Sequence, residues 1–177
     1  MGIEAEKKPM IDNDSNYSIP HHSDLSLWQK PEVIRWSQIL AESYQQLLGK
    51  ELIPYSSTPE ELAKALFEAP FVIVSHGTQT DPILNYGNQT ALQLWSLSWE
   101  ELTETPSRLT AELVNRETRA IMLETAAKQG YIDNYRGIRI SSAGKRFLIE
   151  QAVIWNLKDE FGRKCGQAAT FSDWTWL

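Results

Sequence analysis

The spacing of apolar residues changes twice along this chain of 177 residues. Residues 1–23 are polar and show no periodicity. They have too little apolar surface to offset the entropy lost on ordering, so we expect a disordered tail. Over residues 25–49 apolar positions recur every three or four residues, which predicts a helix with one apolar stripe. From Tyr131 onward the period is two, which is typical of β-strands.

The middle of the chain contains several helix start signals. Thr58-Pro59-Glu60-Glu61 and Ser98-Trp99-Glu100-Glu101 have the pattern of capping boxes, in which a hydroxyl and a glutamate each bond a backbone N–H group. Asn88 is suited to cap another helix, and Asn115 is expected to cap a longer one. A continuous apolar run at 71–75 lies among these helices and predicts a buried strand.

Strands are also predicted over residues 82–86, 131–141, 145–157 and 164–174. The last three are joined by short turns, so they should pair as an antiparallel meander. On the long third strand, strict alternation places on one face Phe147, Ile149, Gln151, Val153 and Trp155. The intervening positions are also largely apolar. Both faces of the sheet should therefore be covered, one of them by the N-terminal helix or by a partner subunit.

These elements predict an α+β fold, with a five-stranded antiparallel sheet, helices on one face and an N-terminal helical arm. The expected organisation is a tail at 1–23, the helical arm at 24–69 and a core domain at 70–177. The chain ends three residues after Trp174, so we expect no output domain after the core.

Composition narrows the function classes. The net charge of −6 argues against a broad nucleic-acid-binding face, which requires cationic charge. The chain has one cysteine, Cys165, no apolar leader after Met1 and no run long enough to span a bilayer. We therefore expect a cytoplasmic protein that does not bind membranes. Seven tryptophans indicate either an aromatic core or an aromatic-lined pocket.

Three stretches resemble the signature of PAS domains. Residues 88–102 resemble the motif "N-x-A…L-x-G-Y-S-x-E-E-L". Asp159 to Gly166 resembles the "D-x-x-G-x-x-x-G" hairpin, and Asp173-Trp174-Thr175 resembles the terminal "D-I-T" triplet. The span from Trp28 to Trp174 is more closely similar to MEKHLA-domain proteins of the cyanobacterial type. The runs that carry this similarity are APFVIVSHGTQTDPILNYGNQTALQLW and YIDNYRGIRISSAGKRFLIEQAVIWN. Related domains lie at the C-terminus of plant class III homeodomain–leucine-zipper proteins, and the resemblance implies a sensory or regulatory domain.

No heme or covalent-flavin signature is present, so the cofactor is unknown. The helix at 115–129 has no histidine to ligate heme, and His76 lies at a strand end. Photoactive flavin domains need a cysteine in a short helix, whereas Cys165 begins the last strand. Arg163 and Lys164 adjoin Cys165, which makes it a weak redox candidate. No metal site is expected, because His21-His22 has no carboxylate or cysteine beside it.

The helical connection over the sheet is expected to frame a ligand pocket. Its candidate residues are Asn88, Ala91, Trp95, Trp99, Tyr135, Ile149, Gln151 and Trp155. We therefore predict a standalone PAS-like sensory or regulatory domain, which binds a small ligand or a protein partner and signals in trans. Self-association or partner binding would use the N-terminal helix or the outer face of the sheet.

Two alternatives stay open at this point. One is a structural dimerisation or assembly module whose core is filled by tryptophans. The other is a cone-fold, isomerase-like enzyme that uses Asp133 or Glu150 as its acid–base group. Apart from this second alternative, no catalytic residue is expected and the chain is predicted not to be an enzyme.

Overall fold

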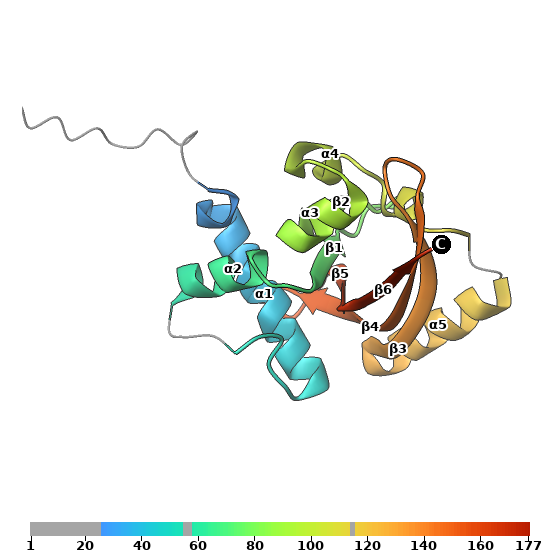
Figure 1. Cartoon of the computed structure of the whole chain (residues 1–177). Helices are drawn as coiled ribbons and strands as arrows, with labels where there is room; N and C mark the ends of the chain where they lie inside the picture. The colour runs from blue at the N-terminus through green and yellow to red at the C-terminus, as the bar shows by residue number, and fades with distance from the viewer. Residues whose placement is uncertain (1–25, 55–57, 114–115) are drawn as a thin grey trace, which may run out of the picture.

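The computed structural model describes residues 26–54, 58–113 and 116–177 (Figure 1). The expected tail at 1–23, the pair His21-His22 and the Asn115 cap lie outside the described residues. The helical elements are η2 Leu27–Gln29, α1 Pro31–Leu48, α2 Pro59–Phe67, α3 Gln89–Trp95, α4 Trp99–Thr103, η3 Ser107–Thr110 and α5 Arg116–Gln129. The strands are β1 Val72–His76, β2 Leu84–Gly87, β3 Tyr131–Ile140, β4 Arg146–Lys158, β5 Lys164–Phe171 and β6 Asp173–Trp176. Among the described helices, none is both long and apolar enough to cross a membrane.

The strands form one antiparallel sheet in the order β2-β1-β5-β4-β3, and β6 pairs with the first half of β4. The sheet therefore has six strands where we expected about five. The additional strand arises because the predicted final strand at 164–174 is divided into β5 and β6. β5 and β6 follow β4 in the same register, and a bend at Ser172 separates them.

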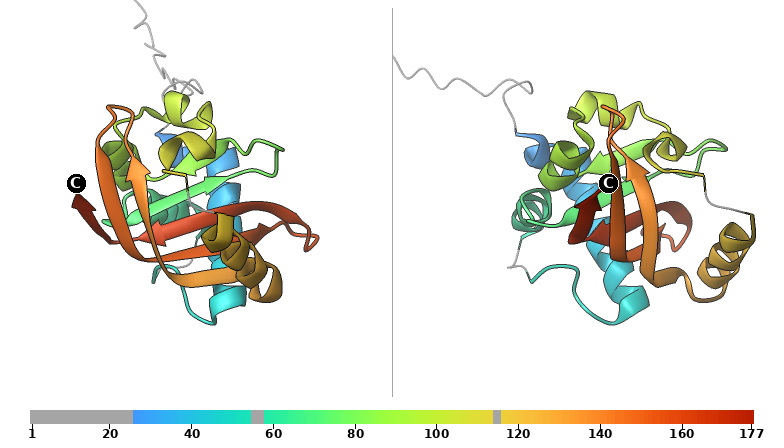
Figure 2. Two further views of the ribbon diagram at one scale, coloured as in Figure 1. Left: turned by 90° about the vertical axis from the view of Figure 1, so that its right-hand side faces the viewer. Right: turned by 45° about the vertical axis from the view of Figure 1, so that its right-hand side comes forward.

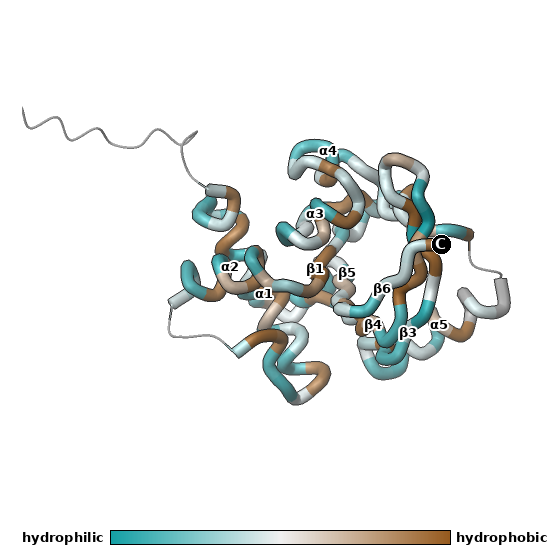
Figure 3. Tube along the Cα trace, viewed as in Figure 1, coloured by the Kyte–Doolittle hydropathy of each residue, from teal (hydrophilic) through white to brown (hydrophobic). Residues whose placement is uncertain are grey.

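Helices cover both faces of the sheet, and the N-terminal arm supplies the cover expected for the second face. α1 and α2 pack on one face around Ile73, Trp155 and Leu157, whereas α3 packs on the other around Phe147 and Ile149. Figure 2 shows α5 on the side of the sheet opposite α1. The physical reason is that β4 carries large apolar side chains on both faces, and each face must be removed from water. Figure 3 shows where hydrophobic residues lie along the chain.

The N-terminal helix α1 covers its own sheet. The indole Nε1–H of Trp155 donates to the backbone oxygen of Leu40 in α1 at 3.3 Å, and its ring packs edge-on against Tyr44 with ring centroids 5.0 Å apart. On β1, the hydroxyl of Ser75 accepts a hydrogen bond from Trp36 Nε1 at 2.9 Å. A covering helix was expected, but the sequence left open whether the arm covers its own sheet or a partner's.

Asn134 and Gln151 interrupt the alternation of β3 and β4. Both residues have φ of 53°, in the left-handed region that non-glycine residues rarely adopt. The pairing register of β3 with β4 shifts on either side of Tyr135. Side chains on one face therefore change from odd to even positions along β4: Ile149 and then Ile154 face α3, whereas Trp155 faces α1. Strict alternation had placed Ile149, Gln151 and Trp155 together, and this prediction is wrong.

The turn between β4 and β5 explains the PAS-like hairpin motif. The Asp159 carboxylate accepts backbone N–H bonds from Phe161 and Arg163, each at 2.9 Å. The bond from the Arg163 backbone is the main cause that lowers the pKa of Asp159 below its usual value. Gly162 has φ of +75°, and a Cβ on Gly166 would come within 2.4 Å of the backbone oxygen of His76. Both glycines are therefore required by backbone geometry.

Candidate functional site

Asn88 fixes the start of α3 above the sheet. Its side-chain oxygen accepts hydrogen bonds from the backbone N–H groups of Ala91 and Ile73, both at 3.1 Å. Its side-chain nitrogen donates to the backbone oxygens of Phe71 at 2.7 Å and Leu66 at 3.2 Å. The Asn88 side chain is fully buried, so it acts as an N-cap and as a joint between α2, β1 and α3.

The capping box at Ser98 positions α4. The Ser98 hydroxyl accepts from the backbone N–H of Glu101 at 3.1 Å, and the Glu101 carboxylate accepts from that of Ser98 at 2.8 Å. These bonds confirm the predicted capping box. They direct Trp99 to the α1 side of the sheet, where its ring packs edge-on against Tyr86 with ring centroids 5.9 Å apart.

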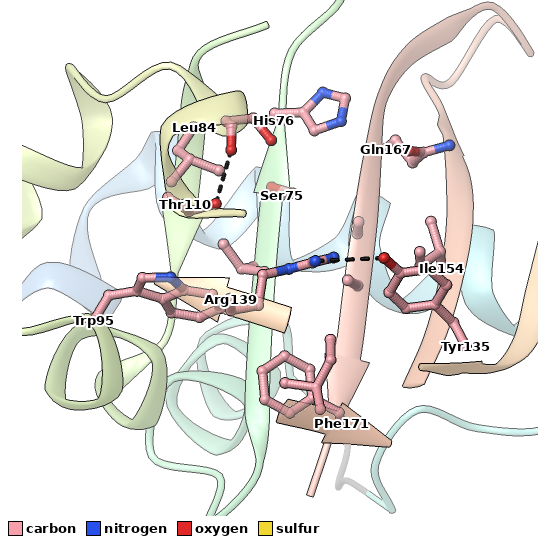
Figure 4. Close-up of a pocket in the computed structure, with 15 residues that line it drawn as sticks. Ser75, His76, Leu84, Trp95, Thr110, Tyr135, Arg139, Ile154, Gln167 and Phe171 are labelled. Atoms are coloured by element: carbon pink, nitrogen blue, oxygen red, sulfur yellow. Dashed lines mark hydrogen bonds between the residues drawn. The ribbon is translucent and has the colours of Figure 1, made fainter. Parts of the chain in front are cut away.

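A cavity of about 100 Å³ lies between α3, η3 and the face of the sheet opposite α1 (Figure 4). Its apolar wall contains Val74, Leu84, Trp95, Ile149, Ile154, Ala168, Ala169 and Phe171. Its polar side chains are those of His76, Ser107, Thr110, Tyr135, Arg139 and Gln167, whereas the Ser75 hydroxyl bonds Trp36 on the α1 side. Among the residues expected to frame a pocket, the structure brings Trp95, Tyr135 and Ile149 together here.

Trp95 forms one wall of this cavity. Its ring is 3% exposed and packs edge-on against Phe147 and Phe171, with ring centroids 5.5 and 6.1 Å apart. The β3–β4 turn holds the end of α3 in place, because Ser142 N donates to the backbone oxygen of Trp95 at 2.9 Å. The indole Nε1–H is buried and has no hydrogen-bond partner among the described residues. Such an orphaned donor carries a desolvation cost of about 1–3 kcal/mol.

Tyr135 and Arg139 form the opposite side of the cavity. The Arg139 guanidinium lies 5.3 Å from the Tyr135 ring centroid and donates to the Tyr135 hydroxyl at 3.4 Å. Gly137 lies between them on β3, and a Cβ there would come within 2.3 Å of the Tyr135 hydroxyl. The absence of a side chain at Gly137 therefore allows the Tyr135 ring to lie along the strand beside Arg139.

A wider pocket beneath α5 shares part of its lining with this cavity. This outer pocket has a volume of about 330 Å³ and includes Met122 and Ala126 of α5. Five residues line both spaces: Ser107, Tyr135, Arg139, Ile154 and Gln167. Arg139 and Tyr135 therefore lie at the boundary between a small interior cavity and a larger pocket that α5 partly covers.

The other expected frame residues lie elsewhere. Asn88 and Ala91 are fully buried in the support of α3. Trp99 and Trp155 pack on the α1 side of the sheet, and Gln151 is exposed on the outer side of the bend in β4. For Gln151 and Trp155 the sequence had no signal, because their placement follows from the two left-handed residues in β3 and β4.

The weaker chemical candidates lie away from the cavity. Cys165 packs against the α1-side cluster, and burial raises the pKa of its thiol, which lowers the reactive thiolate fraction. Asp133 and Glu150 are exposed, and Glu150 pairs with Arg136 at 2.9 Å. The acid–base arrangement of a cone-fold enzyme therefore has no support at these two carboxylates. Within the part of the chain that the structure describes, no group of three or more His, Cys, Asp or Glu residues could hold a metal ion.

Sequence reasoning missed five polar residues whose side chains line the cavity: His76, Ser107, Thr110, Arg139 and Gln167. Arg139 had a usable signal, since Tyr135, Gly137 and Arg139 follow one another at every second position of a strand. The other four come from three separate elements, β1, η3 and β5, and only the fold brings them together.

A family model described as the MEKHLA domain matches residues 34–176. Two plant proteins are similar to the chain. One is the homeobox-leucine zipper protein HOX9 of Oryza sativa subsp. indica, 25% identical over 167 residues, covering 89% of this chain and 20% of that protein. The other is the homeobox-leucine zipper protein REVOLUTA of Arabidopsis thaliana, 26% identical over 133 residues, covering 72% of this chain and 15% of that protein. The chain thus matches a fifth or less of each relative, and these plant relatives do not support the expected cyanobacterial type.

Solved structures show the PAS-like fold. A PAS domain from Colwellia psychrerythraea has a TM-score of 0.50 and 20% identity, covering 61% of this chain and 89% of that one. An RNA-binding light-oxygen-voltage receptor has a TM-score of 0.54 and 21% identity, covering 67% of this chain and 34% of that one. At these identities the similarity supports the fold and carries no ligand with it.

Proposed function

This chain belongs to the MEKHLA domain family, and on that premise we propose that it is a PAS-like sensory domain that regulates rather than catalyses. It binds a small ligand in the cavity between Trp95 and Arg139, and it signals in trans through a protein partner in the cytoplasm. The observation that carries this proposal is the cavity itself, which has convergent polar groups and shares lining residues with a wider pocket beneath α5.

The dimensions and lining of the two spaces support ligand binding. Small-molecule sites are typically concave, mostly apolar and about 300–1,000 Å³ in volume, with a few placed polar groups. The outer pocket is about 330 Å³, and the interior cavity extends it toward Trp95. A ligand in both spaces would contact η3, α5 and β3 at once.

The α5 side chains that the structure describes are exposed or half-buried, which supports a sensory role. They include Met122, which packs against the α3-side core, whereas Ile121 is 60% exposed. Segments with few buried apolar contacts open at low free-energy cost. A ligand that adds contacts beneath α5 would therefore favour the state in which α5 is packed on the sheet over states in which α5 has detached from it.

The outer face of the bent sheet supports partner binding. α1 covers this face over Trp155 and Leu157, but beyond the bend a polar groove lies between β3, β4 and β6. Glu150, Gln151 and Asp173 line this groove. We assign this surface as the output face.

The alternative of a tryptophan-filled assembly module has less support. It requires tryptophan side chains to occupy the interior space. Trp155 instead fills the α1 side of the sheet, and the cavity beside Trp95 is open enough to have a volume of about 100 Å³.

Native mass spectrometry and absorbance of the full chain, purified without denaturant, test the proposed function. We expect a bound small molecule, and its removal should lower the melting temperature, because a ligand that binds only the folded state stabilises it. Adding the extracted molecule back should restore that temperature in wild type but not in Ile149→Trp, which fills the cavity. A chain that carries no small molecule, and whose melting temperature no extract changes, would contradict the proposal.

A further inference from the structure

Arg139 differs from the other arginines whose side chains the structure describes. Arg35, Arg108, Arg136, Arg146 and Arg163 each pair with a carboxylate. Arg139 has no carboxylate partner among the described residues. Its guanidinium donates instead to the Tyr135 hydroxyl and to the backbone oxygen of Ile138 at 3.2 Å. A guanidinium has five N–H donors, so several are available for a ligand.

The position of Arg139 makes this charge significant. The side chain is partly buried and lies at the boundary between the interior cavity and the outer pocket. The backbone there is fixed, because β3 forms a bridge from Arg139 to Ala111, next to η3. The acidic residue of the outer pocket, Glu112, is bonded to Arg146. The described pocket therefore presents one unneutralised positive charge, and it faces the ligand space.

A second donor lies across the cavity. The buried indole N–H of Trp95 has no acceptor, and its ring lines the same space as Arg139. Figure 4 shows Arg139 extending across the cavity toward the Tyr135 hydroxyl, with the Trp95 indole on the other side of Arg139. An acceptor oxygen on a ligand would satisfy the orphaned donor and remove its desolvation cost.

The remaining wall is apolar and small. Ile149, Ile154 and Phe171 line the interior cavity, whose volume of about 100 Å³ is below the roughly 150 Å³ of a cavity that holds benzene. One guanidinium in an apolar setting matches a single negative charge, because a second charge would be buried without a partner. The net charge of −6 also disfavours polyanions.

We propose that the ligand is a small amphipathic monocarboxylate, an inference that rests on the proposed sensory function. Its carboxylate accepts hydrogen bonds from Arg139 and Trp95, and its compact apolar body contacts Ile149, Ile154 and Met122. The ligand thereby joins the sheet, α3 and α5.

Calorimetric titration of the full chain with two matched probe pairs tests this proposal. The pairs are phenylacetate with phenylacetamide and hexanoate with hexanamide, which differ in charge but little in shape. We expect at least one carboxylate to bind about tenfold more tightly than its amide, because charge-assisted hydrogen bonds are the stronger ones. Arg139→Gln should remove that preference, and Arg139→Lys should retain part of it.

A matched control lies on the same strand. Arg136→Gln removes an exposed guanidinium of β3 that faces away from the cavity, and it should leave the carboxylate preference unchanged. Trp95→Phe keeps an aromatic ring but removes the N–H, and it should weaken carboxylate binding several-fold. It also identifies the Trp95 indole resonance in ¹H–¹⁵N spectra, and that resonance should shift when phenylacetate binds wild type.

The outcomes separate the two proposals. Amides that bind as tightly as carboxylates, or a folded Arg139→Gln that keeps the preference, would overturn the carboxylate assignment and leave the sensory function intact. A neutral co-purified molecule would do the same. Failure of every probe, together with a chain that carries no small molecule, would overturn both proposals.

Discussion

At the scale of single residues, the Asn88 side chain is expected to contribute strongly to the stability of the fold. Its buried amide makes four hydrogen bonds, to backbone groups of Leu66, Phe71, Ile73 and Ala91. The Asn88→Ala change leaves these groups without partners inside the protein. We expect the free energy of unfolding in urea to fall by about 3 kcal/mol, the sum of a lost cap and unsatisfied buried groups.

Ser98→Ala is the control for this prediction. Ser98 is also an N-cap, but its bonds to Glu101 are exposed. Its loss should cost only about 1 kcal/mol. Equal effects of the two substitutions would mean that Asn88 acts as a helix cap alone.

Tyr86 gives the molecule a dependence on alkaline pH. Its ring is fully buried, and its hydroxyl has no hydrogen-bond partner of good geometry among the described residues, since the nearby Ser37 hydroxyl donates to Val33 instead. Burial raises the pKa of Tyr86 well above its usual value. In the unfolded chain a tyrosine loses its proton near pH 10, whereas folded Tyr86 keeps it.

The unfolded state therefore binds fewer protons above pH 10, and the free energy of unfolding should fall as pH rises, by up to about 1.4 kcal/mol per unit. Tyr86→Phe should remove this part of the slope. Below pH 9 the same variant should match or exceed wild-type stability, because it loses an unpartnered hydroxyl. Urea melts at pH 7 and pH 11 measure both effects, and parallel pH profiles for the two proteins would contradict the assignment.

At the scale of elements, the bend of β4 depends on the backbone of Gln151. A left-handed conformation costs a non-glycine residue roughly 1–2 kcal/mol, and glycine adopts it freely. Gln151→Gly should therefore stabilise the protein, by up to about 1 kcal/mol in urea unfolding. Thr175→Gly, at a β6 position where no positive φ occurs, should destabilise it. Destabilisation by both substitutions would show that the Gln151 side chain matters more than its backbone.

The elements also show what sequence could and could not reveal. The capping boxes at Thr58 and Ser98 were predictable, because each bonds groups only three residues apart. The antiparallel meander was predictable from its short turns. The bends at Asn134 and Gln151 were not, because glutamine rarely adopts a left-handed backbone and one asparagine within a strand pattern does not by itself indicate a bend. Strand periodicity therefore failed where the sheet curves, and this misplaced Gln151 and Trp155 in the expected pocket.

The same distinction applies to the candidate site. Trp95 and Tyr135 were expected there, because they belong to the helix and strand that face each other. Gln167 and Thr110 could not be expected, since their presence depends on the sheet order and on the path of η3.

At the scale of the whole molecule, Trp155 joins the helical arm to the sheet. It is fully buried between β4 and α1, and it bonds Leu40 and packs against Tyr44. Trp155→Ala should lower the free energy of unfolding by about 3–5 kcal/mol through lost burial and the resulting cavity. Trp176→Ala, which removes a half-exposed tryptophan from β6, should cost much less.

The same variant shows whether α1 and the sheet unfold together or separately. If α1 docks as one unit with the sheet, Trp155→Ala should retain a single transition when followed by far-ultraviolet circular dichroism and by hydrogen exchange of β4. Two separate transitions would indicate that the arm and the sheet unfold independently.

The left-handed residues of the bent strands determine how this gene tolerates the loss of single codons. Each acts like a one-codon insertion into a repeat with a period of two. Deleting the codon for Gln151 alone would therefore restore strict alternation along β4 and leave Ile154 and Trp155 on their present faces. A single-codon deletion at Val153 would instead leave the bend in place and turn the following residues over, which would move Trp155 toward the ligand cavity and Ile154 toward α1.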